Sequence, residues 1–278
     1  MKKILVPIDF SEYSEYALKA SALIAKQMNS EIIVLHMLGL SEAILTKDET
    51  QETREAIYYM KLAEKRFATF LDKDYLKGIK VKETVQNYKI FSEINEVAQE
   101  NEADLIVMGS HGSSGLSEVF VGSNTEKVVR TSDIPVLVIK RPIDEFKIKE
   151  VVFACDFKME NIKPYHEALQ LLELFKAKIH LVYINLPGER FRSSLQIEER
   201  IKEFLLKATS GNVKNFDKVA IENDYSVESG IYNYSKKINA DMIAIPTHGR
   251  KGLSHFFNGS IGEDVVNHAN RPVLTFKI

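Results

Sequence analysis

Part of this sequence is present twice, and the repeat limits the folds open to the chain more than any other feature. The run ADLIVM that begins at Ala103 returns as ADMIAI at Ala240, and the Pro-Val-Leu run at Pro135 returns at Pro272. Both pairs lie 137 positions apart, and three shorter matches between them keep that offset. Chance does not hold one register over five matches, and 278 residues are enough for two domains of ordinary size. The sequence therefore predicts two copies of one domain.

The beginnings of the two copies match at a different offset. Residues 8–10 (IDF) correspond to residues 155–157 (CDF), 147 positions later, so the first copy is ten residues longer in its middle. The extra length falls in a charged segment of helical pattern, roughly residues 41–75, where a surface insertion is well tolerated. A proline and several charges between residues 141 and 147 suit a linker. The predicted domains are residues 1–142 and 147–278.

Each copy alternates short apolar runs with segments of helical periodicity. In the first copy the expected strands are Ile4–Ile8, Glu31–His36, Ile79–Thr84, Leu105–Met108 and Val136–Lys140. Ser11 suits the start of the first helix, and Asn29 suits its end. Strands that alternate with helices imply a parallel sheet covered on both faces. The predicted fold class is α/β, with two tandem doubly wound (Rossmann-like) domains, each holding a five-stranded, mainly parallel sheet flanked by helices.

Composition narrows the classes of function. The net charge of −2 gives no reason to expect binding to nucleic acid or to an anionic membrane. No segment approaches the ~20 apolar residues of a membrane span, and the short apolar run after Met1 does not suit a signal peptide. We therefore expect a cytoplasmic protein. The single cysteine, Cys155, continues an apolar strand, so we expect an inert thiol and no intrachain disulfide.

The chemistry-bearing residues of the first copy follow two of its expected strands. Asp9 comes just after the first strand, and Gly109 just after the fourth. In doubly wound sheets, ligands bind beyond the carboxyl ends of the strands, where the strand order reverses. If the first and fourth strands are neighbours there, Asp9 and Gly109 face one crevice. The glycine-containing segment after Gly109 then leads to a helix N-terminus, which favours phosphate. The plainer alternatives are a simple turn at Gly109 and an aspartate that only begins a helix.

A family resemblance favours the ligand-binding interpretation. The pattern Gly109-x2-Gly112-x9-Gly122-Ser123 resembles the nucleotide-binding motif of the ATP-binding universal stress proteins. The opening run VPIDFS and the closing run PVLVI are also similar to the first and last strands of that family. The resemblance extends over both copies, so the chain is identified as a tandem, two-domain member.

The resemblance implies a role for each matching residue of the first copy. The implied nucleotide-binding residues are Pro7, Ile8, Asp9, Met37, Met108, Gly109, His111, Gly112, Gly122, Ser123, Asn124 and Thr125. Asp9 would bind the ribose hydroxyls, and the backbone of Met37 would contact adenine. The residues from Gly112 to Thr125 would hold the phosphates, largely through main-chain N–H groups. The implied ligand is ATP, or ADP or AMP, with or without Mg²⁺.

The second copy departs from this motif. Pro246 stands where the first copy has Gly109, and proline removes an N–H and fixes φ. Gly262 replaces Thr125, which loses a hydroxyl. The motif residues that remain are Asp156, Gly249, Gly259 and Ser260. We therefore expect a degenerate second site.

The sequence favours nucleotide binding over catalysis. No lysine or arginine lies between Gly109 and Thr125 to offset the charge of a γ-phosphate, so at most weak ATP hydrolysis is expected and no catalytic residue is assigned. His111 and His248 lack a second ligand at metal-binding spacing, so no metal site is expected. The expected function is a stress-response or signalling module. A slow ATP-hydrolysing enzyme and a nucleotide-free scaffold with vestigial sites stay open as alternatives.

The closing strands bear on association. In universal stress proteins the last strand commonly pairs with its equivalent in a second domain, and an open sheet edge favours such pairing. The resemblance therefore implies that residues 136–140 pair with residues 273–277 in an intrachain pseudo-dimer. A homodimer of the whole chain stays open, and the protein partners are not specified by the sequence.

Overall fold

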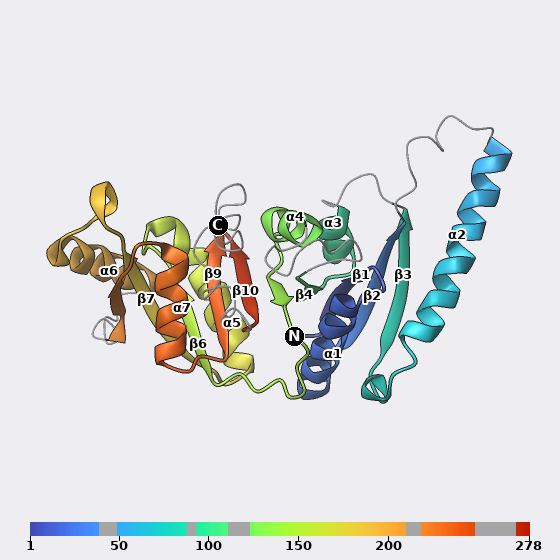
Figure 1. Cartoon of the computed structure of the whole chain (residues 1–278), viewed down its shortest axis with the longest axis horizontal. Coiled ribbons are helices and arrows are strands. Elements are labelled where there is room, and N and C mark those ends of the chain that lie inside the picture. The colour runs from blue at the N-terminus through green and yellow to red at the C-terminus, as the bar shows by residue number, and fades with distance from the viewer. Residues whose placement is uncertain (39–48, 88–92, 111–122, 210–217, 248–270) are drawn as a thin grey trace. The chain divides into compact units, whose positions relative to one another are not determined.

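The computed structural model describes residues 1–38, 49–87, 93–110, 123–209, 218–247 and 271–278 (Figure 1). The described residues form two compact units, one that ends at Phe146 and one that begins at Lys147. Each unit is a parallel sheet with helices packed on it.

The first unit holds five strands in the order β3-β2-β1-β4-β5, and every neighbouring pair is parallel. Its strands are β1 (Lys3–Ile8), β2 (Glu31–Leu38), β3 (Val81–Asn87), β4 (Leu105–Gly109) and β5 (Val136–Ile139). Its helices are α1 (Glu12–Met28), α2 (Glu49–Phe70), η2 (Asp74–Leu76), α3 (Glu93–Glu100) and α4 (Ser123–Thr131). β1 and β4 lie in the middle of the sheet, and all of their residues from Ile4 to Ile8 and from Leu105 to Gly109 are buried, as parallel strands covered on both faces require.

The second unit repeats this order as β10-β9-β6-β7-β8, again with parallel pairs. Its strands are β6 (Glu150–Ala154), β7 (Lys178–Asn185), β8 (Ala220–Asn223), β9 (Met242–Thr247) and β10 (Val273–Lys277). Its helices are η3 (Met159–Asn161), α5 (Ile162–Leu174), η4 (Gly188–Arg190), α6 (Ser194–Ala208) and α7 (Val227–Lys237). The predicted fold class is therefore confirmed: two α/β units, each with five parallel strands and flanking helices.

The ends of the elements differ slightly from the sequence-based expectations. β2 continues two residues past His36 to Leu38, because β3 runs on beside it as far as Asn87. β3 begins at Val81 instead of Ile79. Helix α1 has the expected ends: the Ser11 side chain accepts a hydrogen bond from the Ser14 N–H, and Asn29 terminates the helix in the left-handed conformation at φ 52°.

The repeat extends to unusual backbone conformations. Among the residues that the structure describes, six other than glycine have positive φ, and they form three equivalent pairs at the offsets seen in the sequence. The pairs are Phe10 with Phe157, Asn29 with Lys176, and Glu102 with Asn239. Left-handed backbone is costly for residues other than glycine and asparagine, so its recurrence shows that the two units share detailed turn geometry as well as topology.

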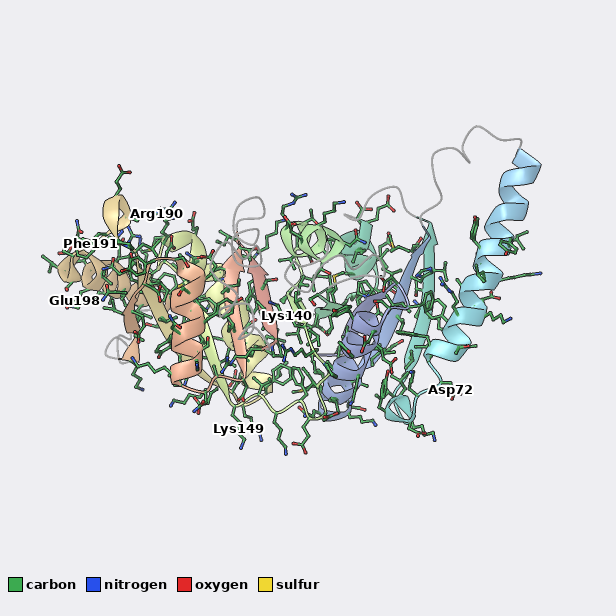
Figure 2. All side chains as sticks on the ribbon, in the orientation of Figure 1. Asp72, Lys140, Lys149, Arg190, Phe191 and Glu198 are labelled. Carbon is green, nitrogen blue, oxygen red and sulfur yellow. The ribbon has the colours of Figure 1, made fainter. Side chains whose placement is uncertain are left out.

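An aspartate joins the beginnings of two strands in each unit. Asp104 Oδ2 accepts hydrogen bonds from the N–H groups of Lys2 (2.5 Å) and Lys3 (3.0 Å). In the second unit, Asp241 Oδ2 accepts from Lys149 (2.8 Å) and Glu150 (2.9 Å); Lys149 is labelled in Figure 2. These aspartates belong to the repeated ADLIVM and ADMIAI runs, so this part of the repeat has a structural role in joining neighbouring strands.

The extra length of the first unit lies before Phe67. Phe67 of α2 packs edge-on against Phe10 at 5.4 Å between ring centroids, and Phe204 of α6 packs in the same way against Phe157 at 5.3 Å. Phe67 and Phe204 lie 137 positions apart, which is already the offset of the carboxyl-terminal halves. Helix α2 begins at Glu49, eight residues before the position that corresponds to the start of α6 at Ser194 (194 − 137 = 57), so most of the inserted residues lengthen α2 at its N-terminal end. Helix α2 packs beside β3, the strand at the edge of the first sheet (Figure 1).

No helix in the described part of the chain is both long enough and apolar enough to span a membrane.

Candidate functional site

The strand order of the first unit reverses between β1 and β4. These strands pair in parallel, with Ile4 opposite Leu105 and Leu5 opposite Ile106. Continued to the ends of the strands, this register sets Asp9 opposite Ser110. The first and fourth strands are therefore neighbours, as the crevice expected from the sequence requires. The residues that follow them lie side by side at one topological switch point, where ligands of doubly wound sheets bind. We call the carboxyl ends of β1 and β4 the first switch point.

The carboxylate of Asp9 is fixed by the start of helix α1. Its Oδ1 accepts hydrogen bonds from the Ser11 N–H (3.0 Å) and from the Ser14 hydroxyl (2.7 Å). The Ser14 Oγ in turn accepts from the Asp9 N–H at 3.1 Å. Asp9 thus begins a helix, as the plainer interpretation of the sequence held, and the same bonds orient its negative charge near the positive end of α1. Ser14 was missed from the sequence, although a serine five residues after the aspartate was its signal.

Gly109 is required by packing. A Cβ built at this position would lie 2.5 Å from the carbonyl oxygen of Tyr13 and 2.8 Å from its Cβ. Only glycine lets α1 approach the end of β4 so closely. The family resemblance implied that Gly109 is a nucleotide-binding residue, and the structure gives it a role in the fold that needs no ligand.

Thr125 joins helix α4 to the end of β4. The side chain is buried, and its Oγ1 donates a hydrogen bond to the Gly109 carbonyl at 2.8 Å. The hydroxyl proton is therefore used within the protein, whereas the sequence had suggested that it would serve a phosphate oxygen. The bond places the first turn of α4, which begins at Ser123, over the carboxyl end of β4. The N–H groups of that turn are the remaining phosphate-binding candidates.

The other described residues of the predicted site lie in strands or beside them. Pro7, Ile8 and Met108 are buried within β1 and β4. Met37 is part of β2, not a residue that follows it. Because β1 ends opposite His36, Met37 extends beyond β1 and pairs with Gln86 of β3, so it still lies next to the first switch point. Asn124 is exposed in the first turn of α4.

Several predicted residues lie outside the described part of the chain. They are His111, Gly112, Gly122, His248, Gly249, Gly259, Ser260 and Gly262. For Ser123 the structure describes the backbone alone.

An aromatic cluster adjoins the first switch point on the side of β2. Phe10, in the left-handed conformation, contacts the ring of His36 at 4.5 Å between centroids, and the Arg66 guanidinium lies 5.1 Å from the centre of the Phe10 ring. His36 Nδ1 donates to the Ile8 carbonyl at 3.0 Å. Burial lowers the pKa of His36, which favours the neutral ring. The cluster therefore combines packed aromatic rings with the Arg66 cation, and its Phe10 directly follows Asp9 in the chain.

The second unit keeps the aspartate but changes its partners. Oδ1 of Asp156 accepts from the Lys158 N–H (3.2 Å) and from Asn161 Nδ2 (2.7 Å), at the positions equivalent to Ser11 and Ser14. The Lys158 ammonium lies 2.8 Å from Oδ2. Its hydrogen bond to Asp156 raises the pKa of the lysine. In this unit a cation from the chain itself accompanies the carboxylate.

The helix start of the second unit also differs. Pro246, the equivalent of Gly109, lies within β9 beside Phe276. Helix α5 begins at Ile162, three residues later than the equivalent of the α1 start, and the short helix η3 fills that interval. A proline ring at this position does not allow the close helix approach that Gly109 permits. The replacement of glycine by Pro246 at the end of the strand is therefore consistent with the later start of helix α5. Cys155, between them, is half-buried, and burial raises the pKa of its thiol, which agrees with an inert cysteine.

Comparisons with known proteins identify the fold and the family. The model of the Universal stress protein family matches residues 1–140 and again residues 147–277. Universal stress protein MJ0577 of Methanocaldococcus jannaschii is 34% identical over 161 residues, which cover 50% of this chain and 95% of that protein. Universal stress protein MJ0531 of the same organism is 31% identical over 157 residues, covering 52% of this chain and 85% of the other.

One similar solved structure extends over both units. The crystal structure of a universal stress protein from Archaeoglobus fulgidus DSM 4304 covers 99% of this chain and 96% of its own, with a TM-score of 0.61 and 20% identity. At that identity the likeness concerns the fold alone. Together with the two matches to the family model, it shows that this chain belongs to the universal stress protein family and carries two of its domains in tandem.

Proposed function

We propose that the first domain binds an adenine nucleotide, ATP in the first instance, at the first switch point, and that its occupancy serves a stress-response or signalling function. The observation that carries the proposal is the position of two oppositely charged groups at adjoining strand ends. The Asp9 carboxylate stands after β1, and the positive N-terminus of α4 is held at the end of β4 by the bond from Thr125 to Gly109.

Each group suits one part of a nucleotide. A carboxylate oriented by Ser11 and Ser14 is an acceptor for the two vicinal hydroxyls of a ribose. The N–H groups at the start of α4 are donors for phosphate oxygens, and the helix dipole adds to that attraction. Met37, which extends past the end of β1, offers main-chain groups to an adenine ring. Residues 111–122 of the motif lie outside the described part of the chain and are assigned to the phosphates on the family resemblance alone.

The chemistry of this site supports binding more than turnover. Between Gly109 and Thr125 the sequence has no lysine or arginine to stabilise the charge that develops on a transferred phosphoryl group. The Thr125 hydroxyl donates to Gly109 and is not directed at a nucleophile. We therefore assign no catalytic residue, and Mg²⁺ would enter as the counter-ion of the nucleotide.

Calorimetric titration of the whole chain with ATP and Mg²⁺ tests the proposal. Asp9→Asn keeps an oxygen that accepts from Ser11 and Ser14, so the start of α1 is retained while the negative charge is removed. We expect at least tenfold weaker binding, a loss of about 1.4 kcal/mol. Asp156→Asn is the matched control and leaves the affinity unchanged. Thermal unfolding of both variants checks that they fold.

Two results would overturn the proposal. Absence of ATP binding by the wild-type chain would favour a scaffold with vestigial sites. Equal affinities for wild type and Asp9→Asn would remove the first switch point from the binding site.

A further inference from the structure

At the strand-order reversal of the second unit, two buried side chains hold polar atoms that have no hydrogen-bond partner in the described part of the chain. They are Asn161 Oδ1 and Thr247 Oγ1, and both residues are only 2% exposed. Buried polar groups in folded proteins are nearly always paired, so each orphaned atom calls for an explanation. Two such atoms at one strand-order reversal favour a missing polar partner.

Strand register places the two side chains near one another. Asn161 is held to Asp156, just after β6, by its 2.7 Å bond to the carboxylate. β6 and β9 pair with Val151 opposite Met242 and Phe153 opposite Ala244. Continued to the strand ends, this register sets Asp156 opposite Thr247, one strand spacing away. We call the carboxyl ends of β6 and β9 the second switch point.

The hydrogen bonds fix what kind of partner Asn161 needs. Its Nδ2 donates to the Asp156 carboxylate, and the flipped amide would instead set two acceptors against each other. Oδ1 is therefore an acceptor that requires an O–H or N–H donor. The Thr247 hydroxyl can donate or accept, while its main-chain carbonyl already accepts from Ile278 at 3.1 Å.

The guanidinium of Arg200 lies next to Asp156 at the second switch point. Arg200 of α6 points its Nη1 at the Asp156 carbonyl, 3.5 Å away, and it forms no ion pair with any carboxylate in the described part of the chain. Lys158, by contrast, is paired with both Asp156 and Glu160. A guanidinium without a carboxylate partner suits a bidentate anionic group such as phosphate or carboxylate.

We propose that the second switch point binds a small anion that also carries hydroxyl groups, a phosphorylated or carboxylated polyol, and that it does not bind an adenine nucleotide. The hydroxyls donate to Asn161 Oδ1 and exchange a hydrogen bond with Thr247, and the anionic group pairs with Arg200. The carboxylate of Asp156 is already engaged by the Lys158 N–H, the Lys158 ammonium and Asn161, so it is not offered to a ribose as Asp9 is. The site is independent of the nucleotide site proposed for the first domain.

The test uses the whole wild-type chain, and the Arg200→Gln variant described below shows how much of the binding belongs to the second switch point. Calorimetry and thermal unfolding are recorded with glycerol 3-phosphate, with D-glycerate and with uncharged glycerol. We expect binding and an upward shift of the unfolding temperature with at least one of the two anions, and neither with glycerol. The stronger of the two anions tells a phosphate site from a carboxylate site.

Variants locate the binding. Arg200→Gln should weaken the anion at least tenfold, whereas Arg190→Gln removes the same charge from an exposed position on η4 and should leave binding unchanged (Figure 2). Thr247→Val removes a hydroxyl that has no partner within the protein, so it should fold at least as stably as its parent and bind several-fold more weakly.

Four outcomes would overturn the proposal. They are no binding of either anion, equal binding by the Arg200→Gln and Arg190→Gln variants, displacement of the anion by ATP, and a high-resolution crystal structure with saturating anion in which water alone contacts Asn161 and Thr247. None of them bears on ATP binding at the first switch point, which the Asp9→Asn and Asp156→Asn titrations test separately.

Discussion

The two domains build the same turn after their first strand but give the aspartate of that turn different hydrogen-bond partners. In the first domain, the Ser11 N–H and the Ser14 hydroxyl orient the Asp9 carboxylate. In the second, Lys158 and Asn161 take the serine positions and a lysine ammonium lies against Asp156. The left-handed phenylalanine between strand and helix is the same in both. A fold can therefore stay constant while two substitutions change the hydrogen bonds and the charge beside one aspartate.

The largest effect should come from the residue that lets α1 approach β4. In Gly109→Ala the new Cβ would lie 2.5 Å from the Tyr13 carbonyl oxygen, which is backbone and cannot move aside cheaply. We expect a loss of about 3 kcal/mol in the free energy of unfolding, measured by chemical denaturation. Gly78→Ala is the control, because Gly78 has φ +82° and open space, and should cost about 1 kcal/mol. Equal losses at the two positions would contradict this account of Gly109.

The strand-joining aspartates should show that the two domains are equivalent where no ligand is involved. Asp104→Ala and Asp241→Ala each remove a carboxylate that accepts two main-chain N–H groups. We expect each to cost about 1.5 kcal/mol. Hydrogen exchange should show faster exchange in β1 for the first variant and in β6 for the second. A loss confined to one variant would break the equivalence of the two domains.

The stability of the first domain should depend on pH through His36, whereas the equivalent position of the second domain has no histidine. Burial lowers the pKa of His36, so the unfolded chain binds a proton more readily than the folded first domain. The stabilising contribution is present at neutral pH and is lost as the pH falls below 6.5, the ordinary value for histidine. The equivalent residue of the second domain is a tyrosine, Tyr183, instead of a histidine. His36→Tyr should therefore flatten the stability of the first domain between pH 7 and pH 5, measured by urea denaturation, and an unchanged slope would contradict the assignment.

The smallest effects concern the left-handed helix ends. Each domain uses asparagine at one such position and a charged residue at the other: Asn29 and Glu102 in the first, Lys176 and Asn239 in the second. Glu102→Gly and Lys176→Gly should each stabilise the chain by about 0.5 kcal/mol, because glycine adopts positive φ without strain. Thermal unfolding measures the gain. The same change at Asn29 should give less, and equal gains at all positions would argue against a conformational cause.

The strand pattern predicted the elements of the fold because it is a local property of the sequence. The repeat predicted that the same set of elements occurs twice. Buried runs such as residues 4–8 and the caps at Ser11 and Asn29 depend on neighbouring residues alone. The predicted ends of β2 and β3 were less accurate, because a strand continues only as far as the neighbouring strand pairs with it.

The candidate site was predictable in its location but not in its contacts. The approach of the Tyr13 carbonyl to Gly109, the bond from Thr125 to Gly109 and the Lys158 pair with Asp156 all depend on how elements distant in sequence, or turns of specific geometry, come together. The orphaned atoms of Asn161 and Thr247 could not be foreseen either, because a missing partner is visible only once the surrounding residues are placed.

The number of ATP molecules bound per chain tests the central claim most directly. We would record native mass spectra of the whole wild-type chain with excess ATP and Mg²⁺. The contrast between Asp9 and Asp156 predicts one nucleotide per chain at saturation. Two nucleotides would mean that Lys158 and Pro246 do not close the second switch point to ATP, and none would mean that the geometry of the first does not make a nucleotide site.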